Sequence, residues 1–209
     1  MLKKIMQKVT TIIVVSGFVV SAFSWMAAQA IAGPAEQDKP DFSKFGKVLI
    51  IYYSLSGNTR EMAQVIHNHT GGDLYDLQIM KEYPPIPEIY EVIKQELADN
   101  QWPEVKQDWP DMAQYDVIFV GGPVWWYTLP TPLLSFLAKA DFKNKPLVPF
   151  CSHGGNYGEY FKRFALEAKN AQVQKGLDFY APLQSTRGYL NSKVVNWLNS
   201  LQLPQVANQ

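Results

Sequence analysis

Hydroxyl side chains and one glycine follow an apolar segment of the sequence. The segment 48–53 is apolar and rich in β-branched residues, as in a buried strand. Directly after it, ahead of a helical pattern, come Ser54, Ser56, Gly57, Asn58 and Thr59. This order predicts hydroxyls and backbone N–H groups at the N-terminus of a helix, where the helix dipole favours an anion. The loop has no lysine and no Gly-Lys-Ser/Thr sequence, so it predicts a site for a cofactor monophosphate and not a nucleoside triphosphate loop.

Two adjacent tryptophans stand in a second loop, residues 121–132, which reads Gly-Gly-Pro-Val-Trp-Trp-Tyr-Thr-Leu-Pro-Thr-Pro. The two glycines let the backbone turn and approach a ligand closely, and Pro123 stiffens the turn. Aromatic core residues usually recur at strand or helix spacing, and Trp125 and Trp126 do not. We therefore expect at least one of these indoles to face a ligand. The alternative is that both fold back over the edge of the sheet.

A third loop begins at Cys151 and combines glycines with a histidine and a tyrosine. Gly154 and Gly155 keep backbone N–H groups accessible, and Tyr157 adds an aromatic face. No acidic residue lies directly beside His153, so we expect it to contact a cofactor or fix the backbone by a hydrogen bond, and not to bind a metal. Cys151 follows an apolar run and is expected to be a buried, unreactive thiol. A Cys-x5-Arg phosphatase loop is excluded, because Tyr157 occupies the position of the arginine.

Alternating strands and helices must position these loops. Apolar runs predict strands at 48–53, 116–120, 146–150 and 177–182, and an alternating pattern predicts a half-covered strand at 73–79. Amphipathic patterns predict helices at 61–69, 88–99, 132–140, 157–169 and 189–201. Such alternation predicts an α/β fold, a doubly wound five-stranded parallel sheet covered on both faces. In the strand order 2-1-3-4-5 the ligand crevice lies between the first and third strands, so the three loops would line it.

The first thirty-two residues have the layout of a secretory signal peptide. Three lysines precede an apolar run at 9–23, and small residues follow, with Ala30 and Ala32 as candidate cleavage positions. An uncleaved membrane anchor is the alternative, although the apolar run is short for a full span. Residues 33–45 are interpreted as a tether and residues 46–209 as the folded domain. We therefore expect an exported, periplasmic protein.

The charge of the chain argues against nucleic acid as a partner. The full sequence has 19 basic and 19 acidic residues. Residues 1–32 hold three of the basic residues and no acidic one, so their removal leaves sixteen against nineteen, a net charge of about −3. Nor is an anionic membrane expected as the main partner, and membrane contact is expected only through an uncleaved signal segment. The single cysteine excludes an internal disulfide.

Taken together, the three loops resemble those of flavodoxins. Ser54-Leu-Ser-Gly-Asn-Thr59 resembles the phosphate-binding loop. Gly122-Pro-Val-Trp-Trp126 and Phe150-Cys-Ser-His-Gly-Gly155 resemble the later loops of an exported, flavodoxin-like bacterial subfamily. The resemblance spans residues 46–202 and implies a flavodoxin-like fold with bound FMN. It implies that the phosphate is held by Ser54, Ser56, Gly57, Asn58 and Thr59, that the isoalloxazine ring is flanked by Pro123, Val124, Trp125 and Trp126, and that the other side is closed by His153, Gly154, Gly155 and Tyr157.

Three functions follow from these expectations. The first is FMN-dependent electron transfer outside the cytoplasm, with a redox partner protein or a quinone. The second is an FMN-dependent quinone or NAD(P)H oxidoreductase, which would share the fold and the loops. The third is a non-redox module that binds another phosphorylated or aromatic ligand. The near-neutral charge departs from the acidic electron-carrier flavodoxins, which weakens the case for an acidic docking face.

Overall fold

The computed structural model describes residues 41–181 and 187–203. The predicted signal peptide at 1–32 and residues 33–40 of the predicted tether lie outside these residues. The end of that tether is packed, because Phe42 and Phe45 are buried around a short 3-10 helix, η1 (Ser43–Phe45). In the part of the chain that the structure describes, no helix has the length and apolar character needed to span a bilayer.

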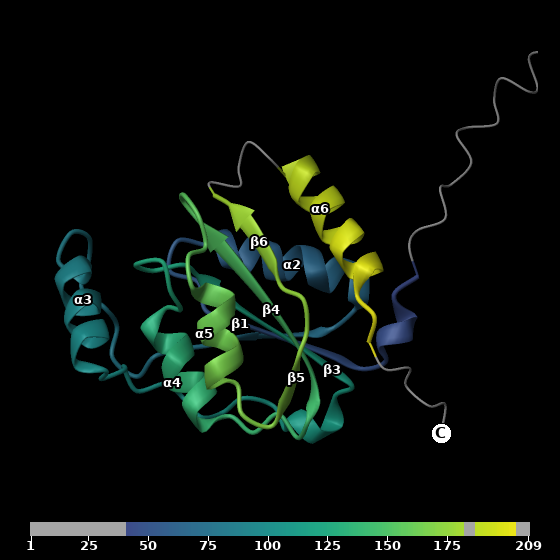
Figure 1. The fold of residues 1–209 in the computed structure, drawn as a ribbon, viewed down its shortest axis with the longest axis horizontal. Helices are drawn as coiled ribbons and strands as arrows, with labels where there is room; N and C mark the ends of the chain where they lie inside the picture. The colour runs from purple at the N-terminus through teal and green to yellow at the C-terminus, as the bar shows by residue number, and fades with distance from the viewer. Residues whose placement is uncertain (1–40, 182–186, 204–209) are drawn as a thin grey trace, which may run out of the picture. The chain divides into compact units, whose positions relative to one another are not determined.

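A parallel sheet forms the centre of the domain (Figure 1). Its strands are β1 (Val48–Tyr52), β2 (Asp73–Asp76), β3 (Val117–Pro123), β4 (Lys145–His153), β5 (Ala171–Val173) and β6 (Leu177–Tyr180). The strands pair in parallel in the order β2-β1-β3-β4-β5, and β6 pairs with β4. This confirms the predicted α/β fold and the strand order 2-1-3-4-5.

Two short strands share the sheet edge where one strand was predicted. β5 pairs with the first residues of β4, and β6 pairs with its last residues, from Phe150 to His153. The predicted strand at 177–182 corresponds to β6, which ends at Tyr180. Gly176 lies between the two strands, and a Cβ there would come 2.2 Å from the ring of Phe161. The chain therefore passes too close to that ring for any larger residue.

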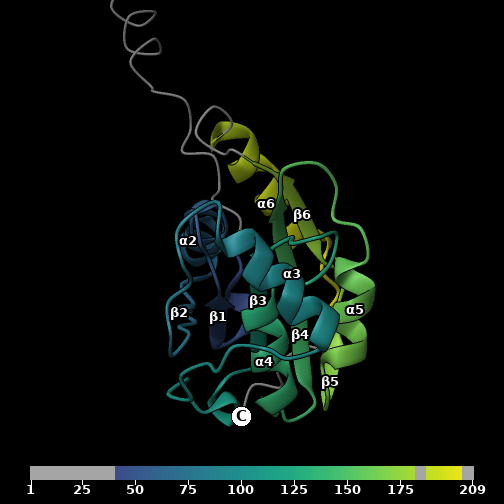
Figure 2. The ribbon, with the colours of Figure 1, turned by 90° about the vertical axis from the view of Figure 1, so that its left-hand side faces the viewer.

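Helices cover both faces of the sheet (Figures 1 and 2). Those that cover it are α2 (Asn58–Thr70), α4 (Thr131–Lys139), α5 (Tyr160–Glu167) and α6 (Arg187–Ser200), whereas α3 (Ile89–Asp99) lies apart from the strands and contacts α4. α2 and α6 pack on one face with Ile50, and α4 and α5 pack on the other with Leu49 and Ile51. Successive residues of β1 thus enter opposite cores, as expected for a strand buried on both faces.

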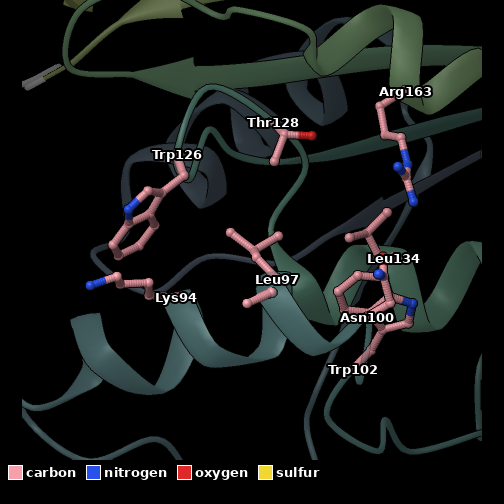
Figure 3. Close-up of a pocket in the computed structure, with 9 residues that line it drawn as sticks. Lys94, Leu97, Asn100, Trp102, Trp126, Thr128, Leu134 and Arg163 are labelled. Carbon is pink, nitrogen blue, oxygen red and sulfur yellow. The ribbon is translucent and has the colours of Figure 1, made fainter.

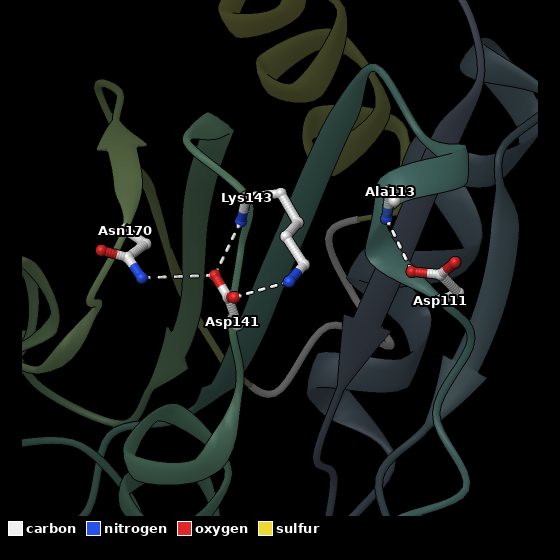
Figure 4. A network of polar contacts seen from close by, with 5 residues as sticks. All are labelled: Asp111, Ala113, Asp141, Lys143 and Asn170. Atoms are coloured by element: carbon white, nitrogen blue, oxygen red, sulfur yellow. Dashed lines mark hydrogen bonds and ion pairs between the residues drawn. The ribbon is translucent and has the colours of Figure 1, made fainter.

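Polar side chains close the turns that precede β3, β4 and β5 (Figure 4). The carboxylate of Asp141 accepts hydrogen bonds from the backbone N–H of Lys143 at 3.1 Å, from its Nζ at 2.7 Å and from Asn170 at 3.4 Å. Asp111 accepts one from the N–H of Ala113 at 3.0 Å. These local contacts satisfy backbone groups of the turns. The candidate chemical groups lie instead at the carboxyl ends of the strands.

Candidate functional site

The carboxyl ends of β1, β3 and β4 bring the three predicted loops together around one cleft of about 290 Å³. The cleft is lined by Ser56, Asn58, Pro123, Val124, Trp125, Ser152, His153, Gly154 and Ala181. This set includes predicted residues from each loop. The sequence argument did not single out Ser152 and Ala181. A cleft at this edge is where open parallel sheets bind their ligands.

The first loop leaves the start of α2 open to an anion. Gly57 precedes the helix with a left-handed φ of 91° and, as a glycine, has no side chain with which to cap the first turn. The N–H of Gly57 donates to the hydroxyl of Ser54 at 3.1 Å, so the side chain of Ser54 stabilises the conformation of the loop. The side-chain amide of Asn58 donates to Ser56 Oγ at 3.0 Å. The N–H groups at the start of α2 and the side chains of Ser56 and Asn58 are therefore candidate donors to an anion in the cleft.

Thr59 is placed differently from the other predicted phosphate ligands. Its side chain is buried, and its hydroxyl oxygen lies 2.8 Å from that of Ser152. The hydroxyl is therefore engaged inside the protein, although Thr59 belongs to the first turn of α2. No local sequence pattern distinguishes Ser152, which follows the apolar residues of β4.

The tight turn from Trp125 to Thr128 separates the two predicted indoles. The backbone N–H and C=O groups of Trp125 and Thr128 bond each other at 3.1 and 2.9 Å. Between them, Trp126 and Tyr127 have positive φ values of 46° and 61°, as in a type I′ turn. Trp125 lines the cleft, with ring contacts to Tyr53 at 5.6 Å and Tyr83 at 5.8 Å. Trp126 does not line it, but borders a separate cavity (Figure 3).

The start of α5 holds this turn in place. The backbone N–H of Glu159 donates to the carbonyl of Tyr127 at 2.7 Å. Gly158 has a φ of 51°, and a Cβ on it would lie 2.3 Å from the same carbonyl oxygen. The close approach therefore requires glycine at position 158. These contacts fix the direction in which each indole leaves the backbone.

His153 is buried at the end of β4, where its Nε2 lies 3.2 Å from the carboxylate of Asp178. Lys193 Nζ lies 3.7 Å from the same carboxylate. His153 Nδ1 is buried and has no hydrogen-bond partner among the described residues. Asp178 belongs to β6, so this partner of His153 could not be predicted from the residues next to His153 in the sequence. In the described part of the chain, no group of three or more His, Cys, Asp or Glu side chains could hold a metal ion.

The remaining residues of the third loop shape its rim. A Cβ on Gly154 or Gly155 would meet no atom within 4 Å, so the loop backbone stands open. Tyr157 is exposed, with its ring 6.4 Å from that of His153, and neither Tyr157 nor Gly155 is among the residues that line the cleft. Cys151 is buried as predicted, and burial raises the pKa of its thiol well above the usual range.

Comparisons with known proteins agree with this geometry. A crystal structure of a flavoprotein in complex with FMN from Lactobacillus acidophilus NCFM superimposes with a TM-score of 0.58 at 25% identity, covering 63% of this chain and 92% of that chain. A structure from Bacteroides uniformis ATCC 8492, assigned to a flavoprotein, gives 0.61 at 23% identity, with coverages of 75% and 100%. A search of curated proteins found no match. The family model of flavodoxins matches residues 47–176, more than half of the sequence, and the chain therefore belongs to the flavodoxin family.

Proposed function

We propose that this protein binds FMN in the cleft at the carboxyl ends of β1, β3 and β4 and transfers electrons outside the cytoplasm. Family membership and the FMN complex of the Lactobacillus acidophilus flavoprotein support FMN as the cofactor. When bound, FMN supplies one-electron and two-electron redox chemistry. The observation that carries the proposal is that the start of α2, with Ser56 and Asn58, lies beside Trp125 in one cleft.

The donor set around this cleft fits a phosphate without a cation. Gly57, the N-cap residue of α2, offers no side chain to the N–H groups of the first turn, and Ser56 and Asn58 line the cleft beside them. Together they would satisfy phosphate oxygens by hydrogen bonds and the helix dipole. Ser54 supports the loop through the N–H of Gly57, and Thr59 supports it through Ser152.

The second and third loops fit a flat, partly apolar ring. Pro123, Val124 and Trp125 offer apolar surface on one side of the cleft, and His153 and Gly154 line it from the third loop. Trp125 is held by edge-on contacts to Tyr53 and Tyr83, so its indole would present a preformed surface. An aromatic contact of this kind contributes about 0.5–1.5 kcal/mol beyond the burial of area.

Binding of FMN can be tested with the phosphate as the variable. We expect the protein to bind FMN at least about tenfold more tightly than riboflavin, because charge-assisted hydrogen bonds contribute about 1.5–3 kcal/mol each. Ser56→Ala should weaken FMN about fivefold and leave riboflavin unchanged. The control is Ser192→Ala, an exposed serine on α6 that donates to the carbonyl of Gly188. If Ser56→Ala weakened the binding of FMN and of riboflavin equally, the phosphate would not be bound by Ser56.

The electron-transfer role needs its own measurement. We expect the chemically reduced, FMN-loaded protein to be reoxidised by a one-electron acceptor such as ferricytochrome c, without steady oxidation of NADPH. Rapid NADPH-dependent turnover of menadione would instead support the quinone or NAD(P)H oxidoreductase. Export, which residues 1–32 support by their sequence, would be tested by cell fractionation and by the N-terminal sequence of the mature protein. Recovery of the intact chain from the cytosol would contradict it.

A further inference from the structure

A second cavity, of about 420 Å³, lies beside the turn that carries the two indoles (Figure 3). α3 provides one wall through Lys94 and Leu97, and α5 contributes Arg163 across from them. Trp126 projects from the turn toward Lys94. Trp102 and Leu134 complete the apolar part of the lining. A volume of this size falls in the range of small-molecule sites, about 300–1,000 Å³.

This cavity is distinct from the cofactor cleft, because the two share no lining residue. Adjacent residues of one turn separate them, with Trp125 on the cleft and Trp126 on the second cavity. The second cavity is therefore a candidate site separate from the cofactor cleft.

Charge and shape restrict what that occupant can be. The lining combines two indoles and apolar side chains with two cations, and it includes no acidic residue. Lys94 Nζ lies 3.7 Å from Glu91 Oε2, and Arg163 Nε lies 2.7 Å from Glu167 Oε1. The ion pair of Arg163 uses one of its three guanidinium nitrogens and leaves the other two as donors. Surface ion pairs of this kind contribute only about 0–1 kcal/mol, so an anion in the cavity can compete with them. A planar ring suits the indoles, and a carboxylate suits the guanidinium.

Backbone strain points to the same cavity. A bulky side chain at positive φ costs about 1–2 kcal/mol, and Trp126 has a φ of 46°. Its side chain gains little burial in return, because it is 45% exposed. The contacts of Gly158 and Glu159 to Tyr127 nevertheless keep the turn in this conformation. Strain that the surrounding structure maintains in this way commonly marks a binding site.

We propose that the second cavity binds a small planar aromatic carboxylate. Its ring would occupy the apolar centre between Trp126 and Trp102, and its carboxylate would meet Arg163. The site is separate from FMN binding and does not depend on it. It gives this flavodoxin a place for an aromatic acid next to the turn that borders its cofactor.

The test uses 2-naphthoate as the probe and 2-naphthamide as an uncharged ligand of the same shape. Calorimetric titration of the FMN-loaded and FMN-free protein should show 2-naphthoate binding in both. The amide should bind at least about tenfold more weakly, because it lacks the charge that Arg163 recognises. Saturating 2-naphthoate should leave the affinity for FMN unchanged within twofold.

Two pairs of variants locate the site. Arg163→Gln should weaken 2-naphthoate about tenfold, whereas Lys162→Gln, the exposed neighbour on α5, should not. Trp126→Asn should weaken the binding of 2-naphthoate about fivefold, because the variant lacks the indole ring. Asparagine is chosen because it tolerates the positive φ of this position, so the turn should keep its conformation. Tyr127→Asn makes the same change at the next residue of the turn, which does not line the cavity.

Four results would overturn the proposal: equal affinity for acid and amide, equal losses in the control variants, competition between 2-naphthoate and FMN, or no binding of 2-naphthoate at millimolar concentration by protein that takes up FMN. Protein that binds 2-naphthoate with these specificities but takes up no FMN would contradict the proposed cofactor and leave the second site standing.

Discussion

The hydroxyl oxygens of Thr59 and Ser152 lie 2.8 Å apart, and both side chains are buried. The two residues are separated by 93 positions in the sequence. Thr59 lies in the first turn of α2, and Ser152 lies near the end of β4 and lines the cofactor cleft. This hydrogen bond ties the first loop of the cleft to the third.

Removing one hydroxyl of this pair should destabilise the fold. Thr59→Val keeps the shape of the side chain but leaves the hydroxyl of Ser152 without this partner, so we expect the free energy of unfolding to fall by about 1–3 kcal/mol. Ser152→Ala should cost a similar amount. The double variant should cost clearly less than the two single changes together, because no orphaned hydroxyl remains. Urea unfolding of the four proteins measures this coupling, and additive losses would show that the two hydroxyls act independently.

Substitution by alanine should affect the stability of the fold very differently at two glycines near the cleft. A Cβ on Gly121 would come 2.3 Å from the ring of Phe150, which is fully buried and cannot move aside. A Cβ on Gly154 would meet no atom within 4 Å. We expect Gly121→Ala to lower the free energy of unfolding by about 2 kcal/mol or more, and Gly154→Ala to change it by less than about 0.5 kcal/mol. Thermal and urea unfolding would test both, and a tolerated Gly121→Ala would mean that β3 and β4 can separate.

The two tryptophans should differ in their effect on FMN. Trp125→Ala should weaken both FMN and riboflavin by about 1–3 kcal/mol, because Trp125 lines the cleft and a ring contact ignores the phosphate. Trp126→Asn should change either affinity by less than about twofold, since its indole borders the second cavity. Fluorescence titration measures both, with urea unfolding to confirm that each variant is folded. A larger loss for Trp126→Asn would support the sequence-based prediction that this indole flanks the ring.

The sequence predicts the central strands well because a buried strand can be recognised from the residue types of that strand alone. The predicted strand at 48–53 matches β1 within one residue, since a strand buried on both faces is a continuous apolar run. The turn signals after β1, β3 and β4 likewise place three loops at one edge. What the sequence did not reveal depends on distant partners. The Asp178 partner of His153 comes from another strand, and the separation of Trp125 from Trp126 depends on Gly158 and Glu159.

Alkaline pH should weaken the fold partly through Tyr53. Burial raises the pKa of its phenol well above the usual range, and the charges of Glu96 and Asp76 act in the same direction. The folded protein therefore keeps a proton that the unfolded chain loses near pH 10. Stability is unaffected by this group below that pH and falls as the pH rises above it.

Tyr53→Phe removes the ionisable phenol and keeps the ring against Trp125. Between pH 7.5 and pH 10.5 the free energy of unfolding of the variant should therefore fall by about 1 kcal/mol less than that of the wild-type protein. The decline should not vanish, because burial also raises the pKa of Tyr83 and of Cys151. Tyr127→Phe, at an exposed position, serves as the control. Urea unfolding at the two pH values measures the difference. An unchanged decline in Tyr53→Phe would mean that this phenol ionises as readily in the folded protein as in the unfolded chain.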